Sequence, residues 1–168
     1  MRITSDWKDS NGTGFTDFGG ELEYKGSISS DDDIVIEIEK ERLRIIGSLR
    51  SKLQIKSSCS IEADGDIVAG TAIVVGSGIK AGGDIVADGD IVAGTAIDAG
   101  LGIKASCSIG AHGSINAGKG IDAGFEIWAG GNINAREGIK SNWGIRAGGD
   151  IVAGGAIEAK EVRKWCQK

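Results

Sequence analysis

The sequence has no proline, few aromatic residues and only three cysteines. Abundant glycine without proline, and without a three-residue period, excludes a collagen-like chain. The cysteines, Cys59, Cys107 and Cys166, are far apart and odd in number. This pattern indicates reduced thiols rather than a disulfide framework, so we expect a cytoplasmic protein.

Long apolar runs are also missing. No stretch of about 18 apolar residues occurs, so we expect no membrane partner. The first residues have no apolar stretch behind them, and we therefore expect no signal peptide. The net charge of −5 argues against a protein that binds phosphate backbones, so direct nucleic-acid binding is not expected. The hydrophobic content of 40% is sufficient for one packed domain.

The dominant feature is an internal repeat of six residues. An isoleucine stands at every sixth position from Ile55 to Ile157, and Leu43 and Leu49 extend this register backwards. Alanine nearly always follows two residues later, and the next position is usually glycine or another turn-tolerant residue. The exceptions at the alanine position are Ser57, Val75 and Ser141. Such a fixed period is typical of solenoid proteins.

Each position of the repeat has a physical reason. Residues two apart in a strand share a face, so the isoleucine and the alanine both point inward and the residue between them points to solvent. The glycine-type residue turns a corner, where a positive φ is often required. A three-residue strand cannot bury its isoleucine alone, but coils stacked about 4.8 Å apart bury the whole column. The sequence therefore predicts an all-β, single-stranded parallel β-helix.

The number of repeats per coil follows from the outward positions. Residues 61–84 resemble residues 85–108, which suggests coils of four repeats. That spacing would stack Lys80 on Lys104, and like charges on adjacent strands repel. A spacing of three repeats instead gives columns of alternating charge: Glu62, Lys80, Asp98, Asn116, Asn134, and Lys104, Asp122, Lys140, Glu158. We therefore predict a triangular cross-section with about 18 residues per coil and almost seven coils, roughly 32 Å long at the spacing of adjacent strands.

Two runs resemble known β-helices. Residues 79–86 (Ile-Lys-Ala-Gly-Gly-Asp-Ile-Val) and residues 145–152 (Ile-Arg-Ala-Gly-Gly-Asp-Ile-Val) are similar to the β-helical part of flagellar assembly protein A and, more loosely, to bactofilins. The resemblance covers roughly residues 43–160. It implies a right-handed helix and a scaffold or polymer role.

The two ends depart from the repeat. Residues 1–42 combine a polar loop with two short alternating segments, and we expect them to form an N-terminal cap. Residues 43–159 are the predicted solenoid. Residues 160–168 form a basic tail in which Val162 and Trp165 are off register. The tail either caps the other end or serves self-association, since an open end is an unpaired strand edge.

No catalytic constellation is recognisable. The only histidine, His112, stands at a corner position, and the uninterrupted repeats leave no long loop to build a cofactor cleft. Cys59 and Cys107 are eight repeats apart, too far for joint metal coordination. We therefore expect no enzyme activity and no catalytic, cofactor-binding or metal-binding residues.

Two surfaces remain as candidates for function. One is a charge-poor outward column with an adjacent aromatic corner; its residues are Val74, Val92, Trp128, Arg146, Phe125 and Trp143. The other is an acidic edge formed by Asp64, Asp66, Asp84, Asp88 and Asp90. The first surface favours a rigid scaffold that binds a protein partner or assembles with itself. The second favours the alternative, a small acidic inhibitor, possibly phage-encoded, that imitates nucleic acid and binds a nucleic-acid-handling protein.

Overall fold

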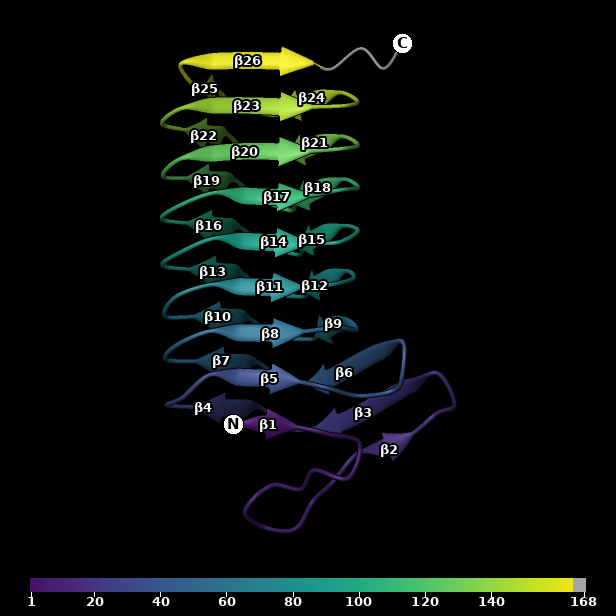
Figure 1. The fold of residues 1–168 in the computed structure, drawn as a ribbon. Helices are drawn as coiled ribbons and strands as arrows, with labels where there is room; N and C mark the ends of the chain where they lie inside the picture. The colour runs from purple at the N-terminus through teal and green to yellow at the C-terminus, as the bar shows by residue number, and fades with distance from the viewer. Residues whose placement is uncertain (165–168) are drawn as a thin grey trace.

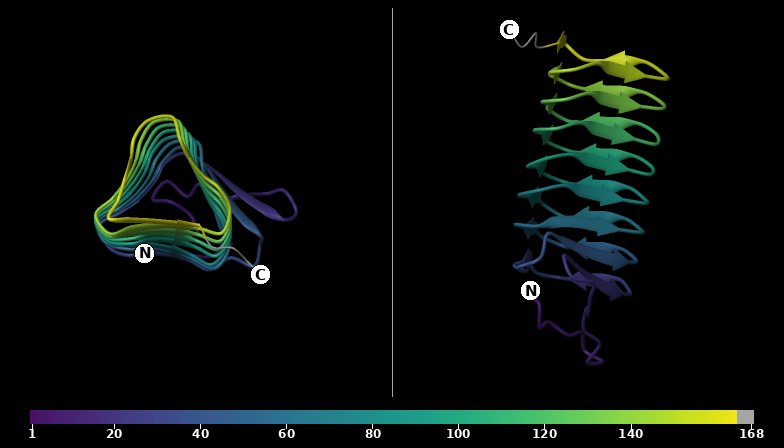
Figure 2. Two further views of the ribbon diagram at one scale, coloured as in Figure 1. Left: turned by 90° about the horizontal axis from the view of Figure 1, so that it is seen from above. Right: turned by 90° about the vertical axis from the view of Figure 1, so that its right-hand side faces the viewer.

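The chain folds as a parallel β-solenoid. A computed structural model describes residues 1–164, and these residues form strands stacked in coils along one axis (Figure 1). Seen from above, the coils superpose on a triangle with three flat faces (Figure 2). The predicted all-β triangular solenoid is therefore confirmed. No helix within residues 1–164 could cross a membrane.

Each face of the prism is one sheet, and the faces are numbered here in the order in which the repeats visit them. Face 1 consists of β1 (Arg2–Ile3), β5 (Ile34–Ile36), β8 (Ile55–Ser57), β11 (Ile73–Val75), β14 (Ile91–Ala93), β17 (Ile109–Ala111), β20 (Glu126–Ala129), β23 (Gly144–Ala147) and β26 (Glu161–Lys164).

Face 2 consists of β2 (Thr16–Asp17), β3 (Glu21–Lys25), β6 (Arg42–Ile46), β9 (Ser60–Ala63), β12 (Ile79–Ala81), β15 (Ile97–Ala99), β18 (Ile115–Ala117), β21 (Ile133–Ala135) and β24 (Ile151–Ala153). Face 3 consists of β4 (Ile28–Ser30), β7 (Leu49–Ser51), β10 (Ile67–Ala69), β13 (Ile85–Ala87), β16 (Ile103–Ala105), β19 (Ile121–Ala123), β22 (Ile139–Ser141) and β25 (Ile157–Glu158).

The predicted coil length is confirmed. Lys80 on β12 pairs with Glu62 on β9 and with Asp98 on β15, each of them three repeats away. The column continues through an amide ladder, in which Asn116 donates to Asp98 and Asn134 donates to Asn116 at 2.8 Å. Opposite charges and amides thus stabilise adjacent coils from the outside.

The coil winds to the right. The near strands, those of face 1, run from left to right in Figure 1, and the chain then passes behind the axis as it climbs. This is the hand expected for parallel strands joined by crossovers.

The interior is the isoleucine column that the repeat predicts. The repeat isoleucines from Ile55 to Ile145 are 0 or 1% exposed, and the alanines two residues later fill the remaining space beside them. Each buried isoleucine stabilises the fold by roughly 1.5–3 kcal/mol relative to its exposed state. Because these side chains touch only the coils above and below, stability is distributed along the prism.

The corner glycines serve a different purpose from the predicted one. None of the glycines from Gly65 to Gly155 has a positive φ; that conformation is confined to Gly12, Gly19, Gly26 and Gly47 near the N-terminus. Instead, the first corner residue approaches the coil beneath it. A Cβ placed on Gly118 would lie 2.0 Å from the carbonyl oxygen of Gly100. Glycine is therefore required by close backbone approach rather than by a left-handed turn.

Corner residues with a side chain show the cost of this approach. The amide nitrogen of Gly118 lies 2.9 Å from the carbonyl oxygen that it bonds on the coil beneath. The corresponding distance is 3.0 Å at Asp64, 3.1 Å at Ser106, 3.3 Å at Asp88 and 3.4 Å at Arg136. A Cβ at this position is thus accommodated with a longer hydrogen bond between coils at Asp88 and Arg136, and with little change at Asp64.

The N-terminal segment contributes stacked strands as well as a cap. β4 and β5 pair in parallel with β7 and β8, so regular stacking begins before residue 43, where the six-residue spacing begins. This adds a coil to the almost seven expected from the repeat. Residues 40–52 contain strands β6 and β7.

An aromatic cluster closes the N-terminal end. Trp7, Phe15 and Tyr24 meet with ring centroids 5.4–6.0 Å apart. The Tyr24 hydroxyl donates to Asp9 at 2.8 Å, which raises the pKa of Tyr24 above its usual value. The polar loop is therefore anchored beneath the first coil.

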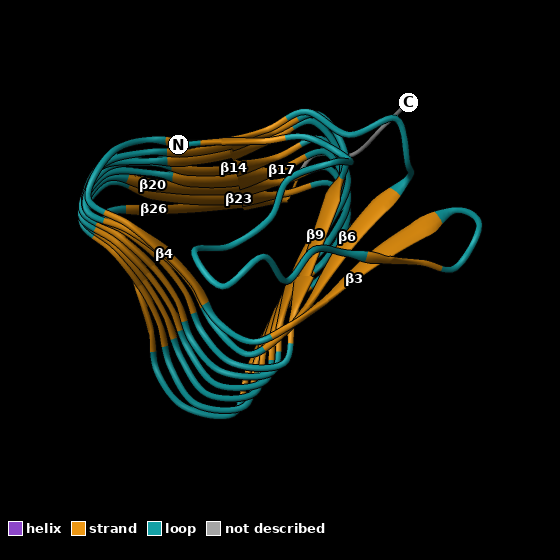
Figure 3. Cartoon of the chain, turned by 90° about the horizontal axis from the view of Figure 1, so that it is seen from below, coloured by secondary structure: helices purple, strands orange, loops and turns teal. Residues whose placement is uncertain are grey.

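Two long strands of face 2 project from the prism. Leu22 on β3 pairs with Leu43 on β6, so this coil is three residues longer than the regular coils above it. Figure 3 shows β3 and β6 reaching beyond the triangular outline, with the β2–β3 hairpin at their tip. We refer to this projection, residues 16–25 and 38–46, as the flange.

The described C-terminal end is a further strand, β26. Val162 pairs with Ile145, so a coil that is one residue shorter than the regular coils brings Val162 into register after all. This corrects the expectation that Val162 is off register. Trp165, the other residue expected off register, lies outside the described residues.

Candidate interaction surface

The charge-poor column lies along the centre of face 1. Successive coils pair Val74 with Val92, Val92 with Gly110, Gly110 with Trp128, and Trp128 with Arg146. The register of three repeats per coil therefore brings these predicted residues into one line. Both valines are half-buried.

Trp128 is more buried than its place in the sequence suggests. Its indole lies over Gly110, where an added Cβ would come within 2.2 Å of the ring. Its ring also lies near His112 in a T-shaped arrangement, with centroids 5.6 Å apart and an interplanar angle of 86°. Trp128 therefore packs flat against the coil beneath it. Its side chain is half-buried, and not fully exposed as the sequence suggested.

The exposed aromatic pair lies on the neighbouring corner, between faces 3 and 1. Phe125 and Trp143 stack with centroids 5.0 Å apart and an interplanar angle of 15°. Their exposed fractions are 49% and 56%. Lys160 on the next coil places its Nζ 5.8 Å from the Trp143 ring, within the range of a cation–π contact. We refer to Phe125, Trp143 and Lys160 as the aromatic corner.

The backbone holds this corner rigidly. The amide of Phe125 donates to Cys107, and the amide of Trp143 donates to Phe125, both at 3.0 Å. Ser141, one of the departures from alanine, donates its hydroxyl to the Phe125 carbonyl at 2.6 Å and accepts from the Trp143 amide at 3.3 Å. The sequence marked Ser141 as an exception, but this bridge was visible only in three dimensions.

Charged groups are few on this side and partly compensate each other. The Arg146 Nε lies 3.1 Å from a carboxylate oxygen of Glu126, an ion-pair contact without hydrogen-bond geometry, and a second nitrogen lies 4.0 Å from Glu161. The stretch of face 1 from Val74 to Trp128 thus presents apolar and aromatic groups, whereas Lys56 below it and Arg146 and Arg163 above it carry charge.

Three of the five predicted acidic residues accept hydrogen bonds from backbone amides. Asp66 and Asp84 lie on adjacent coils as expected, and each accepts a backbone amide from the coil above, at 3.1 and 2.7 Å. Asp90 similarly accepts from the Ser108 amide at 2.8 Å.

Two of these carboxylates also lie near cations. Asp66 forms an ion pair with Arg50 at 2.7 Å, and Asp64 lies 3.6 Å from Arg44. Asp88 is exposed. Asp64, Asp66 and Asp84 lie at the corner between faces 2 and 3, but Asp88 and Asp90 lie at the corner between faces 3 and 1. The expected single acidic edge is therefore wrong, because the five aspartates are divided between two corners.

The thiols differ in their surroundings. Cys59 is buried, and burial raises the pKa of its thiol despite a contact from the Ser57 hydroxyl at 3.2 Å. Cys107 is exposed below Phe125. Cys166 lies outside the described residues. Among residues 1–164, no three His, Cys, Asp or Glu side chains are grouped so as to hold a metal ion.

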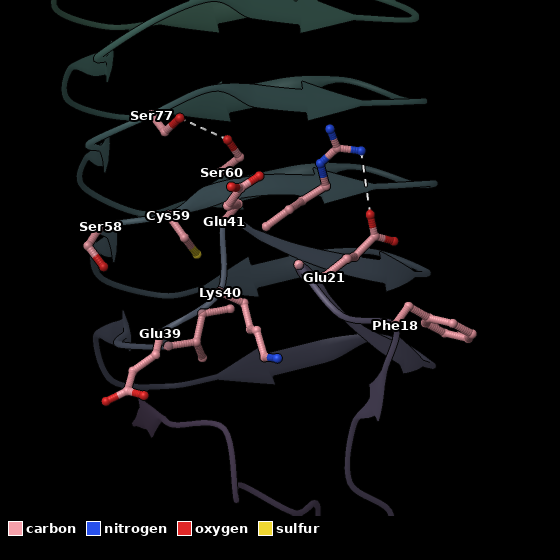
Figure 4. Close-up of a pocket in the computed structure, with 12 residues that line it drawn as sticks. Phe18, Glu21, Glu39, Lys40, Glu41, Ser58, Cys59, Ser60 and Ser77 are labelled. Atoms are coloured by element: carbon pink, nitrogen blue, oxygen red, sulfur yellow. Dashed lines mark hydrogen bonds and ion pairs between the residues drawn. The ribbon is translucent and has the colours of Figure 1, made fainter.

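A hollow that the sequence did not indicate lies beneath the flange. It has a volume of about 740 Å³ and is lined by flange residues such as Phe18, Glu21 and Arg42 and by Ser58, Ser60 and Ser77 on the prism (Figure 4). Arg42 bridges Glu21 at 3.5 Å and Glu62 at 2.9 Å, and the Ser60 and Ser77 hydroxyls bond at 2.9 Å. Arg42, Ser60 and Ser77 are therefore already paired within the chain.

The fold defines the class of this protein as a parallel β-solenoid with a triangular cross-section. No protein-family model, curated protein or solved structure matches the chain in the comparisons made. The likeness to bactofilins and to flagellar assembly protein A thus stays a resemblance of the repeat.

Proposed function

We propose that this chain is a cytoplasmic, non-enzymatic β-solenoid that acts as a rigid protein-binding or self-assembling scaffold. The observation that carries the proposal is the exposed stack of Phe125 and Trp143 beside the charge-poor face 1. Large aromatic side chains on a rigid support are typical of protein interfaces, because they bury much area and lose little conformational entropy on binding.

The rest of the described molecule supports a structural role. The core is continuous, and the backbone of each repeat corner bonds to the coil beneath it. Such a prism presents fixed side chains at a spacing of about 4.8 Å and has little capacity to deform around a substrate. A flat aromatic and aliphatic face on this support suits a protein partner.

The test removes the aromatic stack and leaves the coil intact. Phe125→Ala combined with Trp143→Ala should abolish partner capture from lysates of the native host and any self-association through this face. Val152→Ala is the matched control, because Val152 is an exposed apolar residue on face 2, away from the aromatic corner. Capture and oligomeric state equal to wild type in the double variant would refute this surface.

The acidic inhibitor has less support from the geometry. Asp66, Asp84 and Asp90 accept backbone amides, so these carboxylates already have a structural use. Binding to a nucleic-acid-handling protein that is competed by DNA or RNA, and lost in Asp64→Asn with Asp88→Asn, would favour this alternative over the scaffold.

A further inference from the structure

The backbone amide of the sixth residue of each repeat, directly before the isoleucine, differs from the other amides in the kind of hydrogen-bond acceptor that it uses. The amides of the isoleucine and of the two corner residues after the alanine bond to carbonyls of a neighbouring coil, as in Ile67, Gly82 and Gly83. In several repeats the sixth amide is instead bonded by a side-chain oxygen from the coil beneath. These oxygens belong to Ser48, Ser60, Asp66, Asp84, Asp90, Ser114 and Asn132.

At the corner between faces 2 and 3 this series of side-chain acceptors stops. Ser48 accepts from Asp66, Asp66 from Asp84, and Asp84 from Gly102. Gly102 has no side chain to continue the series. The amides of Gly120, Gly138 and Ala156 consequently have no hydrogen-bond partner among residues 1–164. Their equivalents lower in the same corner show that an oxygen ligand fits this position.

These three amides lie in a hollow of about 550 Å³. Its floor is formed by Gly102, Gly120, Gly138 and Ala156, and we call it the glycine trough. Two ridges flank it: Lys104, Asp122, Lys140 and Glu158 on face 3, and Leu101, Lys119, Glu137 and Gly155 along the corner.

The charges of the ridges are largely unpaired within the chain. Lys104, Lys119, Asp122 and Glu137 form no ion pair among residues 1–164, and Lys140 reaches Glu158 only at 3.9 Å. A trough with free donors between two rows of mixed charge fits a partner that supplies oxygen acceptors and charges of both signs at the spacing of the coils.

That spacing selects the partner. Coils repeat about every 4.8 Å, whereas side chains on one face of an extended peptide repeat about every 6.7 Å. The carboxylates of Asp122, Glu137 and Glu158 would repel the phosphates of a nucleic acid. A second copy of this chain has the matching period.

We propose that the glycine trough is a self-association surface, at which two copies lie side by side and antiparallel. A two-fold axis perpendicular to the solenoid would cross the corner between Gly120 and Gly138. Lys104 then faces Glu158 of the second copy, Asp122 faces Lys140, and Lys119 faces Glu137. Since each pair occurs twice, six opposite-charge contacts form, and carboxylates of each copy lie near the free amides of the other.

Other arrangements match fewer charges. Shifting the second copy by one coil places Lys104 opposite Lys140. A two-fold axis along the solenoid gives four opposite-charge contacts, Asp122 with Lys119 and Lys140 with Glu137, each twice. The antiparallel arrangement therefore has the greatest complementarity, which sets register and orientation more than it sets affinity.

The test exploits reciprocal charge reversal. Sedimentation velocity of the wild type should show a concentration-dependent dimer that weakens as salt rises. Lys119→Glu and Glu137→Lys should each weaken dimerisation about tenfold, because each converts two attractive contacts into repulsive ones. The two single variants mixed in equal amounts should recover the dimer, and so should the double variant alone. In both cases the introduced glutamate of one copy faces the introduced lysine of the other, so every contact between positions 119 and 137 again joins opposite charges.

Several outcomes would overturn the proposal. These are a wild type that stays monomeric to submillimolar concentration, single variants that dimerise like wild type, or a double variant that fails to recover the dimer. The last result would indicate the arrangement with the axis along the solenoid, in which the introduced glutamate would face Asp122. This self-association extends the proposed scaffold role, but Phe125→Ala with Trp143→Ala leaves the trough untouched, so the two proposals fail separately.

Discussion

Close backbone approach at the corners makes a sharp prediction for Gly118→Ala. The new Cβ would lie 2.0 Å from the carbonyl oxygen of Gly100, about 1.4 Å inside an ordinary contact distance. The corner must therefore open. Arg136, on the coil above, shows how a corner opens around a side chain. The hydrogen bond from its backbone amide to the coil beneath is 3.4 Å long, against 2.9 Å at Gly118.

The magnitude follows from three effects. Forcing a methyl group into a filled site costs about 1–3 kcal/mol. Stretching one hydrogen bond between coils removes part of a contribution of roughly 1 kcal/mol. Alanine also restricts the unfolded chain, which returns about 0.4–1 kcal/mol. The expected net loss in the free energy of unfolding is about 1–3 kcal/mol.

Urea unfolding followed by far-ultraviolet circular dichroism measures this loss, and Gly120→Ala is the matched control. Gly120 lies in the same corner, where the nearest atom to a Cβ would be the Gly138 carbonyl oxygen at 3.2 Å. Its alanine variant should change stability by less than about 1 kcal/mol. If Gly118→Ala proves as stable as wild type, the close-approach explanation of the corner glycines is wrong.

Three further outcomes are expected. Asp84→Ala removes the acceptor of a backbone amide and should lower the free energy of unfolding by about 1 kcal/mol, whereas Asp84→Asn should retain most of it; urea midpoints compare the two. The hydrogen bond from Lys80 lowers the pKa of Glu62 below its ordinary 4.5. The ionised carboxylate therefore stabilises the folded state above that pH, and this stabilisation is lost as the pH falls through the folded-state pKa. Glu62→Gln should remove this part of the acid dependence of the free energy of unfolding, measured by unfolding titrations. In a variant without the third cysteine, a maleimide should modify exposed Cys107 rapidly and buried Cys59 only on unfolding; equal rates would contradict the placement of the two thiols.

The repeat made the prism predictable because one constraint recurs in every coil. A buried isoleucine at every sixth position leaves few architectures. The charge of Lys80 decided between coils of three and of four repeats, since only the shorter coil places it between Glu62 and Asp98. The packing of the Trp128 indole on the coil beneath could also have been predicted from the sequence. Once the register is known, Gly110 lies beneath it and leaves room for the indole.

Other features depend on distances that the repeat does not encode. The reason for glycine at Gly118 is a contact between a Cβ and a carbonyl on another coil, which composition alone cannot separate from a turn with positive φ. The flange arises from three additional residues in a segment without repeats. Neither the flange nor the hollow that it lines could therefore be predicted from the six-residue period. The free amides of the glycine trough depend on which side chain lies on the coil beneath, and the six-residue repeat does not fix that position.

The two proposed surfaces lie at different corners of the prism, because the aromatic corner joins faces 3 and 1 whereas the glycine trough joins faces 2 and 3. The glycine trough lies at the corner between faces 2 and 3, which is opposite face 1 in the triangular section (Figure 2). Two copies joined at the trough would direct their aromatic corners away from the interface. Each dimer would then present two equivalent binding faces on one rigid body, so a partner with two sites would be held with a high effective concentration. Loss of the dimer in Lys119→Glu should consequently weaken capture of a multivalent partner while leaving a monovalent partner unaffected.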